Sequence, residues 1–141
     1  MSKERKEGGS SFRGFYTQAD NLQDISSAHT QLICRPDVSK ATHLIYAYRL
    51  EQRGKIVENF ESDRDWGTGH ELLKAMRDND VTGVCFATRL CNPGYVHIGK
   101  KRFQIIADLC MQSYKATQKP TWNITLFFTV SLTLRKTYFF T

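Results

Sequence analysis

Residues 40–50 read KATHLIYAYRL, and this stretch decides the fold class because both of its alternating faces are largely apolar. Successive side chains of an extended chain point to opposite faces of a sheet. The side chains on the two faces are Leu44, Tyr46, Tyr48 and Leu50 on one, and His43, Ile45, Ala47 and Arg49 on the other. A strand that is apolar on both faces is typical of the interior of a sheet.

The segments around this strand give an alternating pattern of strands and helices. EQRGK (51–55) has the charge and glycine of a hairpin turn, and IVENFES (56–62) supplies the return strand. Residues 12–19 and 82–90 have the composition of further strands. Helical spacing of apolar residues occurs within 21–36, 63–81 and 100–114. The order β-α-β-β-α-β-α predicts an α+β two-layer sandwich, with a mixed sheet and helices on one face.

The second and third predicted helices carry recognisable local signals. Thr68 and Glu71 have the spacing of a capping box at the start of the second helix. The third has the clearest helical period in the chain, and its expected buried face consists of Phe103, Ile106, Ala107, Cys110 and Tyr114.

Length and composition indicate one soluble domain. The chain has 141 residues, of which 40% are hydrophobic and 24% charged. We expect a disordered tail over 1–10, a folded domain over 11–116 and a divergent segment over 117–141. The uncharged run 121–134 is shorter than the ~20 residues that cross a bilayer. No apolar segment follows the basic residues near the start, so we expect a cytoplasmic protein without a membrane anchor.

Neither a metal site nor catalytic machinery is predicted. Cys34, Cys85, Cys91 and Cys110 form no CxxC pair, and reduced thiols are expected for them. The four histidines are scattered and the HExxH pattern is absent. No nucleophile with a base partner is visible, so we expect a protein that is not an enzyme and needs no cofactor.

Three cations at the start of the third helix are a candidate anion site. Lys100, Lys101 and Arg102 lie where positive charge opposes the helix dipole, and a bound phosphate would offset that repulsion. Arg89 and Arg49 are at strand ends and extend this into a candidate basic patch, in which Tyr95 would stack on a nucleic-acid base. The net charge of +6 agrees with an acidic partner such as RNA or DNA. A solvated basic face explains the same three residues equally well.

Three motifs, in order, resemble the conserved domain of the IMPACT and YigZ-like proteins. They are KATHLIYAYRL, the acidic ESDRDWGTG (61–69), and ATRL (87–90) followed by IGKKRF (98–103). The similarity runs from about Ser11 to Tyr114. It implies a fold like domain 2 of a small-subunit ribosomal protein. The positions that match the family's motifs are His43, Tyr46, Arg49, Asp63, Gly67, Gly69 and Arg89.

The resemblance also implies a role in translational control during stress. Eukaryotic members are similar to regulators that restrain the kinase activated by amino-acid starvation, by competing for its activator. A separate N-terminal domain carries much of the activator binding in those proteins, and we expect this chain to have no room for it. The main hypothesis is therefore a regulatory domain that binds a protein. An RNA- or DNA-binding module is the alternative, and a small enzyme with an unrecognised pocket is a third.

Overall fold

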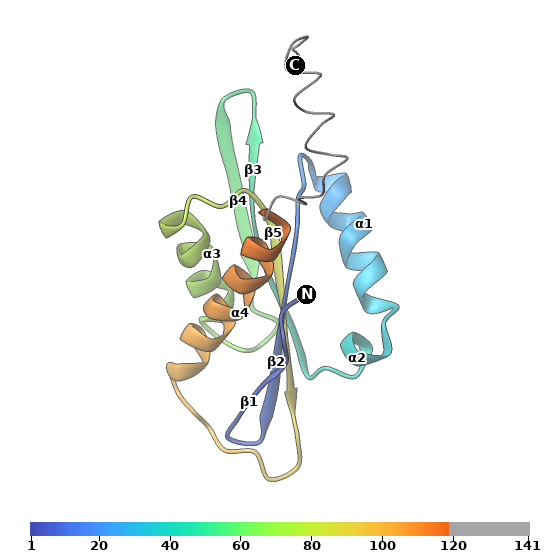
Figure 1. The fold of residues 1–141 in the computed structure, drawn as a ribbon, viewed down its shortest axis with the longest axis vertical. Helices are drawn as coiled ribbons and strands as arrows, with labels where there is room; N and C mark the ends of the chain where they lie inside the picture. Colours follow the sequence, from blue (N-terminus) through green and yellow to red (C-terminus); the bar gives the residue numbers. More distant parts are fainter. Residues whose placement is uncertain (119–141) are drawn as a thin grey trace, which may run out of the picture.

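The computed structural model describes residues 1–118 and contains a five-stranded sheet with helices on both of its faces (Figure 1). The elements in chain order are β1 (Arg5–Glu7), β2 (Ser10–Thr17), α1 (Leu22–Ile33), α2 (Pro36–Ser39), β3 (His43–Gln52), β4 (Lys55–Glu61), α3 (Thr68–Asp78), β5 (Gly83–Cys91) and α4 (Lys101–Gln118). The strands lie in the order β1-β2-β5-β3-β4. The predicted α+β class is confirmed.

All paired strands are antiparallel, whereas the sequence predicts a mixed sheet. β2 and β3 run in the same direction and are connected through α1 and α2, but β5 lies between them and pairs with both. In the same way β4 and β5 are connected through α3, and β3 lies between them. The helical connections therefore join parallel strands that are not neighbours, which the order of elements alone does not show.

Helices cover both faces of the sheet (Figure 1), so the prediction of helices on one face is right for α3 and α4 and wrong for α1 and α2. β5 contributes to both cores, with Cys85 and Ala87 on the α3/α4 side and Val84 and Phe86 on the other. The core on the α3/α4 side includes Phe12, Ile45, Met76, Ile106 and Cys110. The core beneath α1 and α2 includes Phe15, Ile25, Val38 and Leu50. Strands that are apolar on both faces need this cover on both sides.

Residues 1–10 are structured, where the sequence predicts a disordered tail. β1 pairs with β2 through the tight turn at Gly8 and Gly9, whose positive φ angles of 58° and 83° suit glycine. Before β1, the Ser2 amide donates a 2.7 Å hydrogen bond to the Gly14 carbonyl. The turn also holds the β5–α4 loop, because the Val96 amide donates to the Gly8 carbonyl at 2.8 Å. These glycines suggest flexibility in the sequence, but in the structure they form the turn of a hairpin.

The C-terminal prediction falls largely outside the described residues. α4 continues to Gln118, and residues 119–141 of the predicted divergent segment are not described. That the domain folds without this segment stays a prediction. None of the helices within residues 1–118 is both long and apolar enough to cross a membrane.

Candidate functional site

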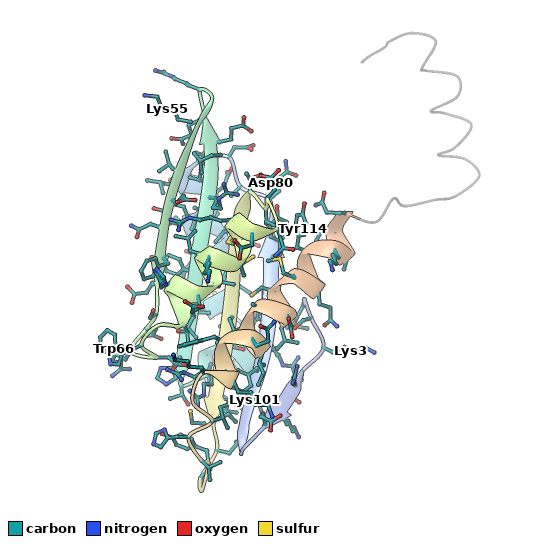
Figure 2. The ribbon with its side chains drawn as sticks, turned by 90° about the vertical axis from the view of Figure 1, so that its left-hand side faces the viewer. Lys3, Lys55, Trp66, Asp80, Lys101 and Tyr114 are labelled. Atoms are coloured by element: carbon teal, nitrogen blue, oxygen red, sulfur yellow. The ribbon has the colours of Figure 1, made fainter. Side chains whose placement is uncertain are left out.

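A cleft of about 310 Å³ opens at the end of the sheet where β3 begins and β5 ends. Its walls come from the β4–α3 loop, the β5–α4 loop and the first turn of α4. In Figure 2, Trp66 and Lys101 lie towards this end of the molecule and Lys55 lies at the opposite end. The lining residues are His43, Arg64, Asp65, Trp66, Arg89, Cys91, Tyr95, His97, Ile98, Gly99 and Arg102.

A buried carboxylate shared by two arginines forms the floor of the cleft. The Arg89 Nη1 donates to both carboxylate oxygens of Asp65, at 3.3 and 3.2 Å, and both side chains are 6% exposed. The Arg102 Nε donates to Asp65 Oδ1 at 2.9 Å. Arg102 also donates from Nη2 to the Trp66 carbonyl at 2.9 Å. One negative charge therefore holds β5, α4 and the β4–α3 loop together.

The start of α3 follows the part of the β4–α3 loop that lines the cleft, and it is capped differently from the predicted capping box. Gly67 precedes the helix, and the Thr68 hydroxyl donates back to the Asp65 carbonyl. The Gly69 amide donates to Ser62 Oγ at 2.9 Å. A side chain at Gly67 would meet the Phe103 ring at 2.9 Å, so glycine here allows α3 to approach α4 closely. The motif position Gly67 is thus explained by packing.

His43 and Asp63 tie the β4–α3 loop to the first residues of β3. The His43 Nδ1 lies 2.7 Å from the Asp63 carbonyl oxygen. Asp63 Oδ2 accepts a 2.8 Å hydrogen bond from the Leu44 amide. Because a carbonyl only accepts, Nδ1 must carry the hydrogen and donate it to Asp63. His43 therefore has a positioning role and still lines the cleft.

The cleft brings together four of the eleven predicted site residues. Those that line it are His43, Arg89, Tyr95 and Arg102, while Asp63, Gly67 and Gly69 lie in or just after the β4–α3 loop and do not line the cleft. The Arg89 guanidinium carbon lies 5.8 Å from the centroid of the Tyr95 ring and 5.5 Å from that of Phe12. Phe12 thereby supports Arg89 from the core side.

Arg49 and Tyr46 lie on parts of the sheet away from the cleft. Arg89 is paired in register with His43, while Arg49 is paired with Gly83. These positions are six residues apart along β3, or about 20 Å at the usual rise. Tyr46 faces the α1 side of the sheet, where burial, followed by the charge of Glu61, raises the pKa of its hydroxyl. The predicted patch of Arg49 with Arg89 is therefore not formed.

The basic run before and within the first turn of α4 is partly neutralised within the chain. Lys101 Nζ lies 3.1 Å from Glu7 Oε2, and Arg102 pairs with Asp65. Lys100 is exposed and does not line the cleft. Two carboxylates thus offset the repulsion with the helix dipole. The basic run therefore does not by itself indicate an anion site.

Arg49 belongs to a separate ion cluster between β3, β4 and α3. Its Nε donates to Glu58 Oε2 at 2.9 Å, and Arg77 Nη2 donates to Glu58 Oε1 at 2.6 Å. Arg49 also donates to the Val81 carbonyl at 3.1 Å. Hydrogen bonding to Arg77, and then to Arg49, holds the pKa of Glu58 below its usual range.

Glu58 should therefore make stability depend on pH. A carboxyl whose pKa is lower in the folded state stabilises the protein above its unfolded pKa of about 4.3, and this contribution is lost as pH falls through the folded pKa. We expect Glu58→Gln to lower stability at pH 7 and to flatten its pH dependence below about pH 5. Urea unfolding from pH 7 to pH 3 measures this. The exposed Glu51→Gln variant is the control, and equal slopes for both variants would contradict the prediction.

The sequence alone missed four lining residues with obvious chemistry: Arg64, Asp65, Trp66 and His97. Trp66 is 75% exposed. The position of Trp66 between charged and glycine residues could have indicated an exposed site residue, because a tryptophan in a polar loop is seldom buried in the core. Asp65 was visible within the acidic motif, but its burial depends on residues 24 and 37 positions further along.

The four cysteines and four histidines are the side chains most often found as nucleophiles or metal ligands. All four cysteines are free thiols, as predicted, and Cys85 and Cys110 are buried. Hydrogen bonding to Cys110, together with burial, raises the pKa of the Cys85 thiol well above its usual value. Within residues 1–118 there is no group of three or more His, Cys, Asp or Glu side chains placed to hold a metal ion.

Comparison with known proteins identifies the family. Residues 8–114 match the Impact N-terminal domain, so the chain belongs to the Impact N-terminal domain family. A solved structure of the two-domain translational regulator Yih1 is similar, with a TM-score of 0.55 and 16% sequence identity. The similarity covers 79% of this chain and 45% of that chain, so this chain spans less than half of that regulator. None of the curated proteins gives a significant match.

Proposed function

We propose that this domain acts in translational control by binding a protein partner. The observation that carries the proposal is the family match over residues 8–114. The fold shared with a solved translational regulator supports it further. In the finer form of the proposal, the domain acts in the cytoplasm during stress. It restrains the kinase activated by amino-acid starvation by competing for the activator of that kinase, and it does so without catalysis.

The rim of the cleft is the surface best suited to such a partner. Trp66 is 75% exposed, and on the opposite loop Val96 is 57% exposed and Tyr95 is 40% exposed. Tryptophan, tyrosine and arginine dominate the binding energy of protein interfaces. The floor beneath them is held by the Asp65 ion cluster, so a partner would meet a preorganised surface.

The proposal is tested by measuring binding of the purified chain to the activator of the starvation kinase. Trp66→Ala should weaken that binding by roughly tenfold or more, the effect of losing an interface hot spot. Leu22→Ala is the matched control, because Leu22 is also exposed, at 57%, but begins α1. No binding of the activator by the unmodified chain, or equal binding by both variants, would count against the proposal.

Nucleic-acid binding is the alternative, and the charge distribution gives it less support. Lys119, Arg135 and Lys136 lie beyond residue 118, while all 14 acidic residues lie before it. The net charge of +6 therefore falls to +3 for residues 1–118. A nucleic-acid complex would weaken steeply between low and physiological salt and would be lost after nuclease treatment.

A further inference from the structure

The interior of the cleft has the size of a small ligand site. Its volume of about 310 Å³ is at the lower end of the range of about 300–1,000 Å³ typical of such sites. The protein partner proposed above would bind at the rim, and nothing in that proposal assigns an occupant to the interior. A small ligand in the interior would share only the rim residues Trp66 and Tyr95 with that partner.

Positive charge exceeds negative charge among the lining side chains. Arg64, Arg89 and Arg102 line the cleft, and the Asp65 carboxylate is the acidic side chain among them. Asp65 is shared by Arg89 and Arg102. Arg64 is exposed and forms no ion pair within residues 1–118. The interior thus favours an anion.

Arg89 is a mostly buried side chain with one guanidinium nitrogen that has no hydrogen-bond partner within residues 1–118. The residue is only 5% exposed. Its Nε donates to Ser10 Oγ at 3.3 Å and its Nη1 to Asp65, while Nη2 makes no hydrogen bond within residues 1–118. Every fully buried side-chain nitrogen or oxygen in that part of the chain has a partner. Nη2 is therefore not fully buried, and Arg89 is among the residues that line the cleft.

Two helix N-termini add to the positive electrostatic potential of the cleft. α3 begins at Thr68, directly after the lining residue Trp66 and Gly67, and α4 begins at Lys101, directly after Gly99 and Lys100. Each N-terminus carries about half a positive charge, while the Thr68 and Gly69 amides of α3 already donate to the Asp65 carbonyl and to Ser62 Oγ. Guanidinium groups and helix N-termini together match the oxygens of a phosphate group.

Aromatic rings stand at the mouth of the cleft. Trp66 comes from the β4–α3 loop and Tyr95 from the β5–α4 loop. Such rings stack on planar ligands in a way that tolerates many ring systems. Their position above the arginines would allow one molecule to place a phosphate inside and a ring against the rim.

We propose that the cleft binds a phosphate monoester attached to a planar ring, a ligand of the nucleoside monophosphate class. The phosphate contacts Arg89 Nη2 and Arg64, and the ring contacts Tyr95 and Trp66. A continuous nucleic-acid strand fits less well. Its binding needs cations spread along a groove, whereas Arg89 is buried at the floor of this cleft.

The test is isothermal titration calorimetry of the full chain with adenosine 5′-monophosphate, guanosine 5′-monophosphate, inorganic phosphate and adenosine. At least one nucleotide should bind with 1:1 stoichiometry and about tenfold more tightly than phosphate or adenosine. Arg64→Gln should weaken nucleotide and phosphate binding by about tenfold each, the usual effect of losing a charged hydrogen bond. Tyr95→Leu should weaken nucleotide binding and leave phosphate binding unchanged.

The matched control is Arg53→Gln. Arg53 is exposed and has a positive φ of 55°, like Arg64 with 65°, but it lies in the β3–β4 turn far from the cleft. In a Trp122→Phe background Trp66 is the remaining tryptophan, and its emission should change with nucleotide but not with phosphate. The proposal would be overturned if no nucleotide bound, or if nucleotide bound no more tightly than phosphate. It would also be overturned if Arg64→Gln and Arg53→Gln had equal effects. Preferential binding of a single-stranded oligonucleotide that Arg64→Gln leaves unchanged would overturn it as well.

Discussion

Replacing Asp65 by asparagine is expected to lower the free energy of unfolding by about 3–5 kcal/mol, which is the usual cost of removing one partner from a buried ion pair. Arg89 would remain buried with no opposing charge, because its side chain is 6% exposed and Asp65 is its only carboxylate partner within residues 1–118. The loss of the Asp65 charge would destabilise Arg102 less, since its side chain is 19% exposed and also donates to the Trp66 carbonyl. Urea denaturation at pH 7 measures the difference.

A second substitution separates the loss of charge balance from a simple loss of packing. In Asp65→Asn with Arg89→Met, the unpaired buried charge is gone, and a large part of the stability should return. Asp78→Asn is the control for removing an exposed carboxylate, and it should change stability by less than about 0.5 kcal/mol. The explanation fails if Asp65→Asn behaves like Asp78→Asn, or if adding Arg89→Met destabilises the protein further.

Local sequence patterns predicted β2 to β5 and α1, α3 and α4, because each signal lies within its own segment, but they missed β1 and α2. The alternation in residues 43–50 correctly separated the side chains of β3 onto two faces. The same alternation implies cover on both sides of the sheet, which the prediction of helices on one face ignored. The position of β5 between β2 and β3 could not be predicted in this way. It depends on which strands pair at long range, and no local pattern records this.

The candidate site was predicted in part for the same reason. The motif positions His43, Asp63 and Arg89 meet at one end of the sheet because β3 and β5 are neighbours in register there. The pairing of Arg102 with Asp65 across 37 positions is a tertiary contact. Because of this contact, a carboxylate balances the charge of Arg102 at the start of α4. Spacing along the chain could not reveal that contact.

The close approach of α4 to β2 makes Gly14 the second position at which a small change should have a large effect. A Cβ atom at Gly14 would lie 2.6 Å from the carbonyl carbon of Leu109 and 2.7 Å from the amide nitrogen of Cys110. Both are backbone atoms of α4, so no side-chain rotation can relieve the overlap. The whole helix would have to move away from the sheet and loosen the packing of its buried face.

Gly14→Ala is therefore expected to cost about 3 kcal/mol of unfolding free energy, at the upper end of the usual range for overpacking. Gly54→Ala is the control, because no atom lies within 4 Å of a Cβ atom at that turn position. Its φ of +78° should cost about 1–2 kcal/mol through backbone strain alone. Urea denaturation gives both values, and amide hydrogen exchange should show α4 losing protection in Gly14→Ala only. A cost for Gly14→Ala below that for Gly54→Ala would mean that α4 can move away from β2 easily, and that the contact contributes little to holding Arg102 over the cleft.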